Sequence, residues 1–202
     1  IRPGEKAKDG GEFKGEIESG LMEMMQSKLD PTLKNVDSLT VTLTKVVGEF
    51  AKLKAGDQVL DLYGGVGLFT SQFLEAVGES GQIDLVEGSK SATADARRNF
   101  AEDSVVTVHT GDVAKILPRF SQASVIILDP PREGAGKEVI AECARLLPRT
   151  IVYVACDPAA LARDVSYLRE HGYALQQLRA FDLFPMTHHI ESVALLTLDK
   201  VS

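Results

Sequence analysis

The sequence is short of several residue types, and each shortage disfavours a class of protein. Two cysteines among 202 residues are too few for a disulfide framework or a four-thiolate zinc site, which favours a reducing, cytoplasmic location. No run approaches the roughly 18 consecutive apolar residues of a membrane span, and the first residues show no secretory signal pattern. With 22 Lys+Arg against 29 Asp+Glu, the net charge is −7, which disfavours a freestanding nucleic-acid-binding module.

The length and the composition suit one globular domain. Hydrophobic residues make up 44% and charged residues 25%, both near the globular average. The first twenty residues are rich in Gly, Lys and Glu and have few apolar anchors. We therefore expect residues 1–38 to be a flexible leader or the remnant of a preceding region, and residues 39–202 to form the functional domain. The first residue is Ile1 rather than Met, so we expect a preceding portion of the protein.

Segments typical of strands and of helices alternate along the chain. Strands are predicted at 58–63, 82–86, 105–109, 124–128, 150–155, 173–181 and 192–198. Helices are predicted at 39–53, 68–77, 89–100, 113–120, 137–147 and 158–171. Such alternation predicts an α/β, Rossmann-like fold, in which a seven-stranded, mostly parallel sheet carries helices on both faces. Ligands of these sheets bind at the carboxyl ends of the strands.

The first predicted strand ends in a glycine-rich loop. Residues 61–67 read Asp-Leu-Tyr-Gly-Gly-Val-Gly and lead directly into a helix, and glycines there let the backbone turn tightly and approach a ligand. Counted from Gly65, the third glycine position of the dinucleotide pattern G-x-G-x-x-G is Thr70, so the loop fits NAD poorly. Asp61, Gly65 and Gly67 fit the Asp-x-x-x-Gly-x-Gly loop of class I S-adenosylmethionine enzymes better.

Acidic residues follow the next three strands. Glu87 lies 26 residues after Asp61, where a carboxylate can accept hydrogen bonds from both ribose hydroxyls of the cofactor. Asp112 is placed to meet the adenine edge, although it could equally be the N-cap of the short helix that follows. Asp129 opens the loop Asp-Pro-Pro-Arg, in which two prolines hold a carboxylate at a fixed place beside the predicted pocket.

Cys156 directly follows the fifth strand. Asp157 is a good N-cap and Pro158 a good first helical residue, so Cys156 lies just ahead of a helix N-terminus. The positive end of that helix should lower the pKa of the thiol, which is a setting for a nucleophile. Cys143 lies within a predicted helix and is interpreted as an inert, buried residue.

These motifs resemble the RNA 5-methyluridine methyltransferase family, class I enzymes that methylate uracil C5 in tRNA and ribosomal RNA. The resemblance spans about residues 55–198 and is carried by the runs DLYGGVG, LDPPREG, YVACDPAALARDV and FDLFPMTHHIE. It implies that Cys156 is the nucleophile and Glu191 the proton acceptor. It also implies that S-adenosylmethionine contacts Tyr63, the loop through Gly64, Gly65, Gly67 and Leu68, and the carboxylates Glu87 and Asp129.

The resemblance further implies a class I methyltransferase domain that acts on tRNA or rRNA with help from an RNA-binding domain in front of it. We also expect the protein to be a monomer. Three features depart from the family pattern. Gly64 stands where many members have Cys, and Asp157 stands where Asn is usual. The Phe-x-Gln motif expected before the first strand is not found in residues 13–16 or 22–26.

Two alternatives share the cofactor. A 5-methylcytosine RNA methyltransferase would carry a cysteine in the loop after the fourth strand, where this chain has Asp129 to Arg132. A non-catalytic S-adenosylmethionine-binding domain would bind the cofactor without a reaction. The neighbouring pair His188 and His189 suggests a metal at first glance, but no third ligand stands at a useful spacing, so no metal is predicted.

Overall fold

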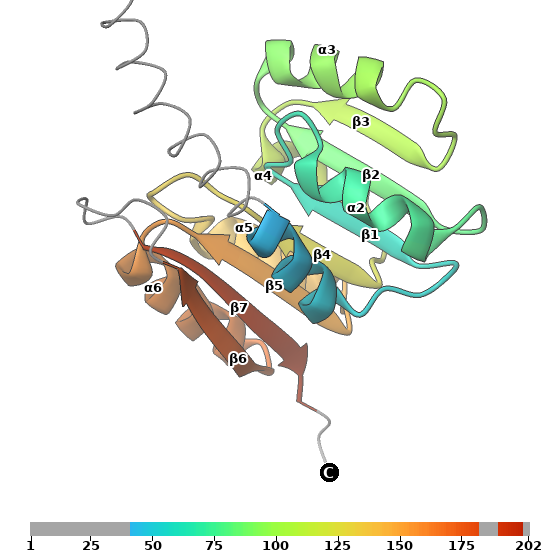
Figure 1. Ribbon diagram of the computed structural model, residues 1–202. Helices are drawn as coiled ribbons and strands as arrows, with labels where there is room; N and C mark the ends of the chain where they lie inside the picture. The colour runs from blue at the N-terminus through green and yellow to red at the C-terminus, as the bar shows by residue number, and fades with distance from the viewer. Residues whose placement is uncertain (1–40, 182–189, 200–202) are drawn as a thin grey trace, which may run out of the picture. The chain divides into compact units, whose positions relative to one another are not determined.

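Seven strands form one sheet in the computed structural model, which describes residues 41–181 and 190–199 (Figure 1). The strands are β1 (Gln58–Leu62), β2 (Gln82–Glu87), β3 (Val106–Thr110), β4 (Val125–Leu128), β5 (Thr150–Ala155), β6 (Tyr173–Phe181) and β7 (Glu191–Leu198). Their order across the sheet is β3-β2-β1-β4-β5-β7-β6. Strands β1 to β5 pair in parallel, and β7 runs antiparallel to both β5 and β6. The predicted mostly parallel sheet is confirmed.

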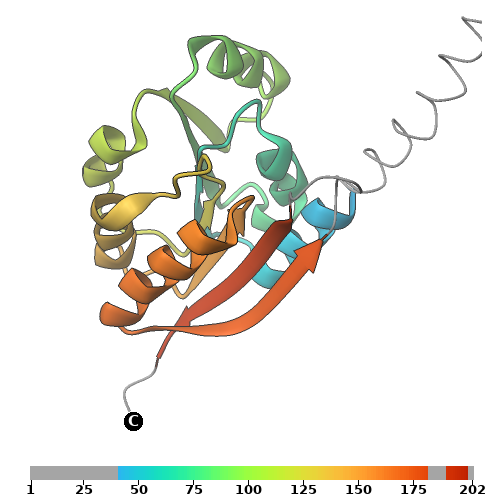
Figure 2. The same ribbon diagram turned by 90° about the vertical axis from the view of Figure 1, so that its left-hand side faces the viewer.

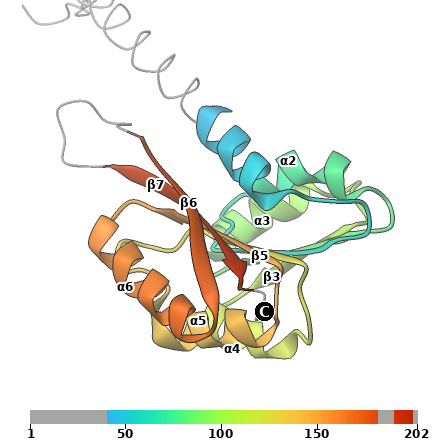
Figure 3. The same ribbon diagram turned by 90° about the horizontal axis from the view of Figure 1, so that it is seen from below.

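Helices cover both faces of this sheet, as predicted. They are α2 (Leu68–Val77), α3 (Lys90–Asn99), α4 (Val113–Ile116), α5 (Gly136–Arg145) and α6 (Pro158–Glu170), together with the helical residues 41–51. Residues 41–51, α2 and α3 lie on one face, and α4, α5 and α6 lie on the other (Figures 2 and 3). Within residues 41–181 and 190–199, every helix is too short or too polar to pass through a lipid bilayer.

The central strand β4 is apolar throughout because both of its faces are buried. All four residues of β4 are buried, and alternate side chains point to opposite faces. Ile126 and Leu128 join the core beneath α4, α5 and α6. Val125 and Ile127 join the core beneath α2 and residues 41–51. Two apolar layers therefore hold the middle of the sheet and fix where its strands end.

The predicted helix at 113–120 is wrong in its second half. The α-helix ends at Ile116 and a 3₁₀ turn follows at Leu117–Arg119. Pro118 has no backbone N–H to continue the α-helical ladder, which accounts for the change. The other described element ends differ from the prediction by at most two residues.

An ion pair closes the amino-terminal edge of the parallel strands. Arg149 donates from Nη1 to Asp57 Oδ1 at 2.8 Å, from Nη2 to Asp57 Oδ2 at 2.6 Å, and from Nη2 to the Lys52 carbonyl at 3.0 Å. Burial tends to raise the pKa of Asp57, but the bonds from Arg149 and from the Lys54 amide outweigh it, so the pKa is lowered. This pair joins the start of β1 to the turn before β5.

The loop between β1 and α2 depends on two glycines in the left-handed region. Gly65 has φ 56° and Gly67 has φ 94°. A Cβ at Gly67 would lie 2.2 Å from Cε2 of Phe100, whereas a Cβ at Gly65 would meet nothing within 4 Å. Both positions favour glycine because of their backbone conformation, but only at Gly67 would a Cβ also clash with a neighbouring side chain, that of Phe100.

These two positions predict different losses of stability for the same substitution. Gly65→Ala should lower the free energy of unfolding by about 1–2 kcal/mol, the cost of left-handed backbone for a residue with a Cβ. Gly67→Ala should lower it by about 2–5 kcal/mol, because overpacking adds roughly 1–3 kcal/mol. Urea denaturation of the two variants measures the difference, and equal losses would contradict the role given to Phe100.

Candidate active site

The carboxyl ends of β1 to β4 enclose a pocket of about 680 Å³. Its lining consists of Tyr63, Glu87, Gly88, Gly111, Asp112, Val113, Asp129 and Pro131. Four of these residues are predicted cofactor contacts, and they come from four different strand ends, as expected for a parallel sheet. Gly88, Val113 and Pro131 were missed by sequence reasoning, although each stands next to or near a predicted residue at the same strand end.

Asp61 lies below the glycine loop and is fully buried. Its Oδ2 accepts hydrogen bonds from Thr70 Oγ1 at 2.6 Å and from the Thr70 amide at 3.2 Å. Its Oδ1 has no hydrogen-bond partner in the described part of the chain. Burial raises the pKa of Asp61 to about 6, the bonds from Thr70 oppose that rise, and the charge of Glu87 adds to it. A buried acceptor is therefore left open at the foot of the loop.

Glu87 fastens the same loop to the end of β2. Its Oε2 accepts from the Gly65 amide at 3.1 Å, and its Oε1 accepts from the Ser89 amide at 2.6 Å. A carboxylate has about four lone-pair sites, so Glu87 can accept further hydrogen bonds from a ligand in the pocket. The other predicted cofactor contacts of this loop and of the start of α2 are not among the residues that line the pocket; they are Gly64, Gly65, Gly67 and Leu68.

Tyr63 has a backbone that is unusual for its residue type. Its φ is 63°, in the left-handed region that bulky residues seldom adopt. The Tyr63 and Gly64 amides both donate to the Val86 carbonyl, at 2.8 and 3.2 Å, and these bonds hold the turn against β2. Strain of this kind collects at binding sites, where the surrounding structure supports it. Burial raises the pKa of Tyr63 to about 12, so a neutral phenol borders the pocket.

Asp112 combines the two roles that sequence reasoning left open. Its Oδ1 accepts from the Ala114 amide at 2.9 Å, so it is the N-cap of α4. It also lines the pocket. A strand end that leads directly into a helix places the cap residue at the ligand edge, so capping and ligand contact are compatible here.

Cys156 and Glu191 meet through the pairing of β5 with β7. The last register pair of that ladder is Ala155 with Ser192, so the next residue on each strand is Cys156 and Glu191. Because β7 is antiparallel, its first residue lies at the edge where β5 ends. Both side chains are half-buried. The two residues predicted to do chemistry are thus neighbours, although 35 positions separate them in the sequence.

Asp129 extends this pair toward the pocket. Its amide donates to the Leu62 carbonyl at 3.2 Å, which places the loop after β4 beside the end of β1. Burial raises the pKa of Asp129 to about 7, and the charges of Asp61 and Glu191 add to the rise. Asp129 therefore stands between the pocket and the pair formed by Cys156 and Glu191.

The expected lowering of the Cys156 pKa is wrong. Burial raises the pKa of this thiol, and the carboxylates of Glu191 and Asp129 raise it further, while the guanidinium of Arg132 lowers it. The helix setting itself is as predicted, since Asp157 caps α6 by accepting from the Ala160 amide at 2.7 Å. The two carboxylates come from other strands, so the sequence around Cys156 could not show them.

Cys143 and the described histidines, His109 and His171, do not line the pocket. Cys143 is fully buried in α5, and burial raises the pKa of its thiol. His109 pairs through Nε2 with Asp84 Oδ1 at 2.7 Å. Among the residues that the structure describes, no three His, Cys, Asp or Glu lie together as metal ligands. His188 and His189 lie outside the described residues.

Two family models match this chain. The model for tRNA (uracil-5-)-methyltransferase matches residues 112–199, which include Asp129, Cys156 and Glu191. The model for protein-L-isoaspartate(D-aspartate) O-methyltransferase matches residues 31–129, which include the glycine loop and Glu87. The second match thus ends before the strand that precedes Cys156.

Individual RNA methyltransferases are also similar to this chain. An uncharacterized RNA methyltransferase of Streptomyces avermitilis is 48% identical over 157 residues, which cover 77% of this chain and 36% of the relative. The 23S rRNA (uracil(1939)-C(5))-methyltransferase of Acinetobacter baylyi is 36% identical over 175 residues, which cover 84% of this chain and 37% of the relative. This chain spans about a third of the length of the curated relatives it matches.

A solved structure aligns with the same region. It is the tRNA (uracil-54, C5)-methyltransferase of Pyrococcus abyssi in complex with S-adenosyl-L-homocysteine, with a TM-score of 0.66 and 30% identity. The alignment covers 79% of this chain and 38% of that chain.

The charges around Cys156 predict how its titration responds to substitution. Glu191→Gln should lower the pKa of the thiol, because a negative charge that disfavours the thiolate is removed. Arg132→Gln should raise it by roughly one pH unit, because an opposing positive charge is lost. The rate of iodoacetamide alkylation against pH, mapped to Cys156 by peptide mass spectrometry, measures both. Shifts of the same sign in the two variants would show that these charges do not control the thiol.

Proposed function

Since the chain belongs to the tRNA (uracil-5-)-methyltransferase family, we propose that it carries the domain of an enzyme that transfers a methyl group from S-adenosylmethionine to uracil C5 in RNA. The observation that best supports the proposal is the juxtaposition of Cys156, Glu191 and Asp129 at the edge that holds the acidic pocket. Residues 39–202 are proposed as the catalytic domain.

The residues of the pocket fit S-adenosylmethionine. The cofactor bears a sulfonium and an ammonium group, and the pocket is lined by the carboxylates of Glu87, Asp112 and Asp129. Glu87 has acceptor sites for ribose hydroxyls, and Asp61 Oδ1 is a buried acceptor without a partner in the described chain. When bound, the cofactor supplies the methyl group as an electrophile. We assign Tyr63, Gly64, Gly65, Gly67 and Leu68 to the loop that holds it.

Cys156 makes the uracil reactive. Uracil C5 is a weak carbon nucleophile, and addition of a thiolate to C6 converts it into an enolate, which is nucleophilic catalysis by cysteine. The pKa of Cys156 is raised, so the resting group is the thiol and its proton must leave when sulfur attacks. Asp129, with a pKa of about 7, is a neighbouring group suited to accept that proton near neutral pH.

Glu191 completes the reaction. After C5 has gained a methyl group it still carries a hydrogen, and C6 is still bonded to the Cys156 sulfur. Glu191 takes the C5 proton, the C5–C6 double bond re-forms, and the C–S bond breaks to release the thiolate. Its position across from Cys156, one residue beyond the last pair of the β5–β7 ladder, lets both residues reach the same face of one base.

The residues argue against the 5-methylcytosine alternative. The loop after β4 offers the carboxylate of Asp129 where those enzymes would carry a thiol. The other cysteine of the chain, Cys143, is fully buried in α5 and far from reach of a base. RNA, as tRNA or rRNA, is therefore proposed as the partner through its uracil. A non-catalytic cofactor-binding domain is the remaining alternative, and covalent trapping separates it from an enzyme.

Loss of the base should trap the reaction after methylation. Glu191→Gln should still transfer the methyl group but release the product slowly. When unmodified RNA is supplied as substrate, a covalent complex between Cys156 and the methylated RNA should therefore accumulate. Denaturing gels and mass spectrometry of the complex measure it. Turnover at the wild-type rate without an accumulated complex would assign the proton transfer to another group.

A covalent adduct with modified RNA tests which cysteine is the nucleophile. RNA with 5-fluorouridine lacks the C5 proton needed for release, so the wild-type protein should form a stable adduct with it. Cys156→Ala should abolish the adduct and Cys143→Ala should retain it. An adduct mapped to Cys143, or one retained in Cys156→Ala, would overturn the assignment.

Cofactor binding should depend on Glu87. Glu87→Ala should weaken S-adenosylmethionine binding by roughly 1–3 kcal/mol, since hydrogen bonds to a charged group are lost. Glu75→Ala, an exposed carboxylate on α2, is the matched control and should bind as the wild type does. Titration calorimetry measures all three proteins. Preference of the wild type for NAD would refute the proposed cofactor.

A further inference from the structure

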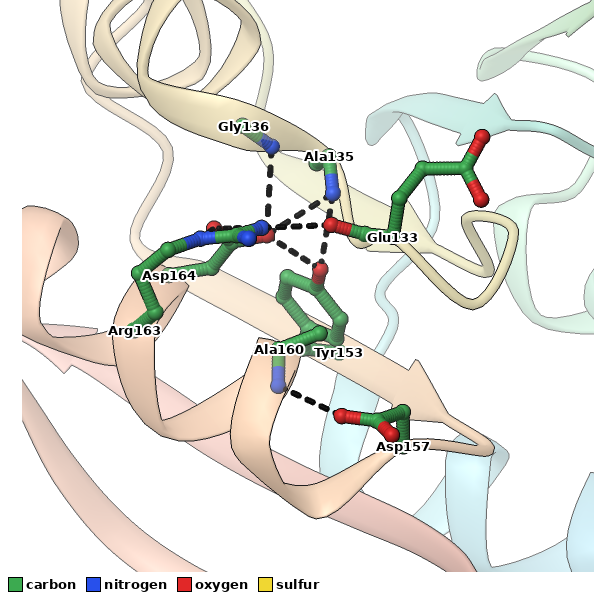
Figure 4. Close-up of polar contacts among 8 residues, drawn as sticks. All are labelled: Glu133, Ala135, Gly136, Tyr153, Asp157, Ala160, Arg163 and Asp164. Carbon is green, nitrogen blue, oxygen red and sulfur yellow. Dashed lines mark hydrogen bonds and ion pairs between the residues drawn. The ribbon is translucent and has the colours of Figure 1, made fainter.

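A second cluster of polar groups lies behind the loop that carries Asp129 and Arg132. At its centre is Asp164, which is fully buried on the apolar face of α6 together with Leu161 and Leu168 (Figure 4). A charged residue at such a position is costly unless its acceptor sites are filled. The mechanism proposed above does not use Asp164, so its partners call for an explanation.

Asp164 accepts five hydrogen bonds. Its Oδ2 accepts from the Tyr153 hydroxyl at 2.6 Å, from the Ala135 amide at 2.7 Å and from the Gly136 amide at 3.2 Å. Its Oδ1 accepts from Arg163 Nε at 2.9 Å and from Arg163 Nη2 at 2.8 Å. The donors come from β5, from α6 itself, from the loop before α5 and from the first residue of α5, and Figure 4 shows them converging on one carboxylate.

Two further bonds tighten the same contact. Arg163 Nη2 also donates to the Glu133 carbonyl at 2.6 Å, and the Ala135 amide also donates to the Tyr153 hydroxyl at 3.0 Å. Tyr153 is fully buried, and burial and its bond to Asp164 raise the pKa of its phenol, so the hydroxyl stays a donor. Backbone groups at positions 133, 135 and 136, at the end of the loop and the start of α5, are thus bonded to the cluster.

The loop lies against this cluster without room for a side chain at Gly134. A Cβ there would lie 2.6 Å from Arg163 Nη2 and 2.6 Å from Asp164 Oδ2. Gly134 has φ 80°, and its amide donates to the Pro131 carbonyl at 2.8 Å, which closes a turn around Arg132. The backbone that follows Arg132 is therefore held at van der Waals distance from α6.

The cluster joins the two segments that carry the candidate active-site residues, the loop after β4 and the segment that runs from Cys156 into α6. The loop after β4 carries Asp129 and Arg132, and α6 begins two residues after Cys156. Clamping this loop to the second turn of α6 limits how far Arg132 can move from Cys156. The bonds of the clamp begin at Glu133, the residue next to Arg132.

We propose that Asp164 is a positioning residue, which with Tyr153 and Arg163 locks the loop after β4 onto α6 and thereby holds Arg132 beside Cys156. The inference rests on the proposed function only where it treats Cys156 as the nucleophile. The hold on Arg132 is a property of the folded chain and can be measured without RNA or cofactor.

The matched comparison is the ion pair at the opposite edge of the sheet. Asp57 is 7% exposed and accepts two bonds from Arg149 and one from the Lys54 amide, yet it lies among the amino-terminal ends of the strands. Asp57→Asn removes a comparable buried charge without touching the loop after β4. If the role of Asp164 were purely structural, Arg132→Gln would change the alkylation pKa of Cys156 equally in the two variants.

The experiment measures how strongly Arg132 still acts on Cys156. Arg132→Gln should raise the alkylation pKa of Cys156 in the wild-type chain, as predicted above. In Asp164→Asn the same substitution should raise that pKa by less than half as much, because a released loop no longer keeps the guanidinium near the thiol. In Asp57→Asn the full effect of Arg132→Gln should persist.

Each outcome decides the proposal. An equal effect of Arg132→Gln in the wild type, Asp164→Asn and Asp57→Asn backgrounds would overturn it, and so would no effect in the wild type. If Asp164→Asn does not fold by circular dichroism, Arg163→Gln and its control Arg149→Gln replace the pair, since both arginines lie at the surface. Failure of methyl transfer alone would count against the proposed function and leave this measurement unaffected.

Discussion

Strand β7 enters the sheet between β5 and β6 and runs antiparallel to both, so its first residue lies where the parallel strands end. A seventh parallel strand would have placed its last residue at that edge instead, and Glu191 would lie at the far side of the molecule. The ladder of backbone hydrogen bonds fixes the register, and a slip by one residue would turn the side chain of Glu191 to the other face of the sheet. The meeting of Glu191 with Cys156 therefore depends on backbone pairing more than on either side chain.

The same convergence of strand ends concentrates negative charge. Burial, with a further contribution from neighbouring carboxylates, raises the pKa of Asp61 from 3.8 to about 6 and that of Asp129 from 3.8 to about 7. For an acid whose pKa is raised by folding, ionisation as the pH rises through that interval costs folding free energy. The site is thus under electrostatic strain near neutral pH. A cationic ligand would relieve that strain.

Much of this organisation could be predicted from the sequence, and the reasons differ by residue. The apolar run of β5 predicted its bounds as observed, because all of its residues are buried and such burial leaves a plain pattern. The bounds of β6 were also as predicted, although most of that strand is exposed. The rule that ligands meet strand ends predicted that Tyr63, Glu87, Asp112 and Asp129 would share one pocket, and they line it. Their roles toward the cofactor stay predictions.

The parts that could not be predicted depend on contacts between distant segments. The pKa of Cys156 depends on Glu191 and Asp129, which the local sequence does not show. The bonds of Asp164 to the loop join residues 28 and 29 positions apart. One local signal did exist, since Asp164 interrupts the apolar stripe of α6 between Leu161 and Leu168, and a carboxylate there requires buried donors. This pattern predicts a buried cluster of hydrogen-bond donors around Asp164, but it does not identify the donors.

The bonds that Asp164 makes to the loop end on backbone amides, and this has a consequence for how the loop can diverge. An amide is present whatever side chain position 135 carries, so the bond from Ala135 to Asp164 does not itself depend on that side chain. Gly134 has no such freedom, because its Cβ would enter the carboxylate and the guanidinium. Other side chains of the loop can therefore change in evolution without loss of its backbone bonds to Asp164, provided that Gly134 and Asp164 are kept.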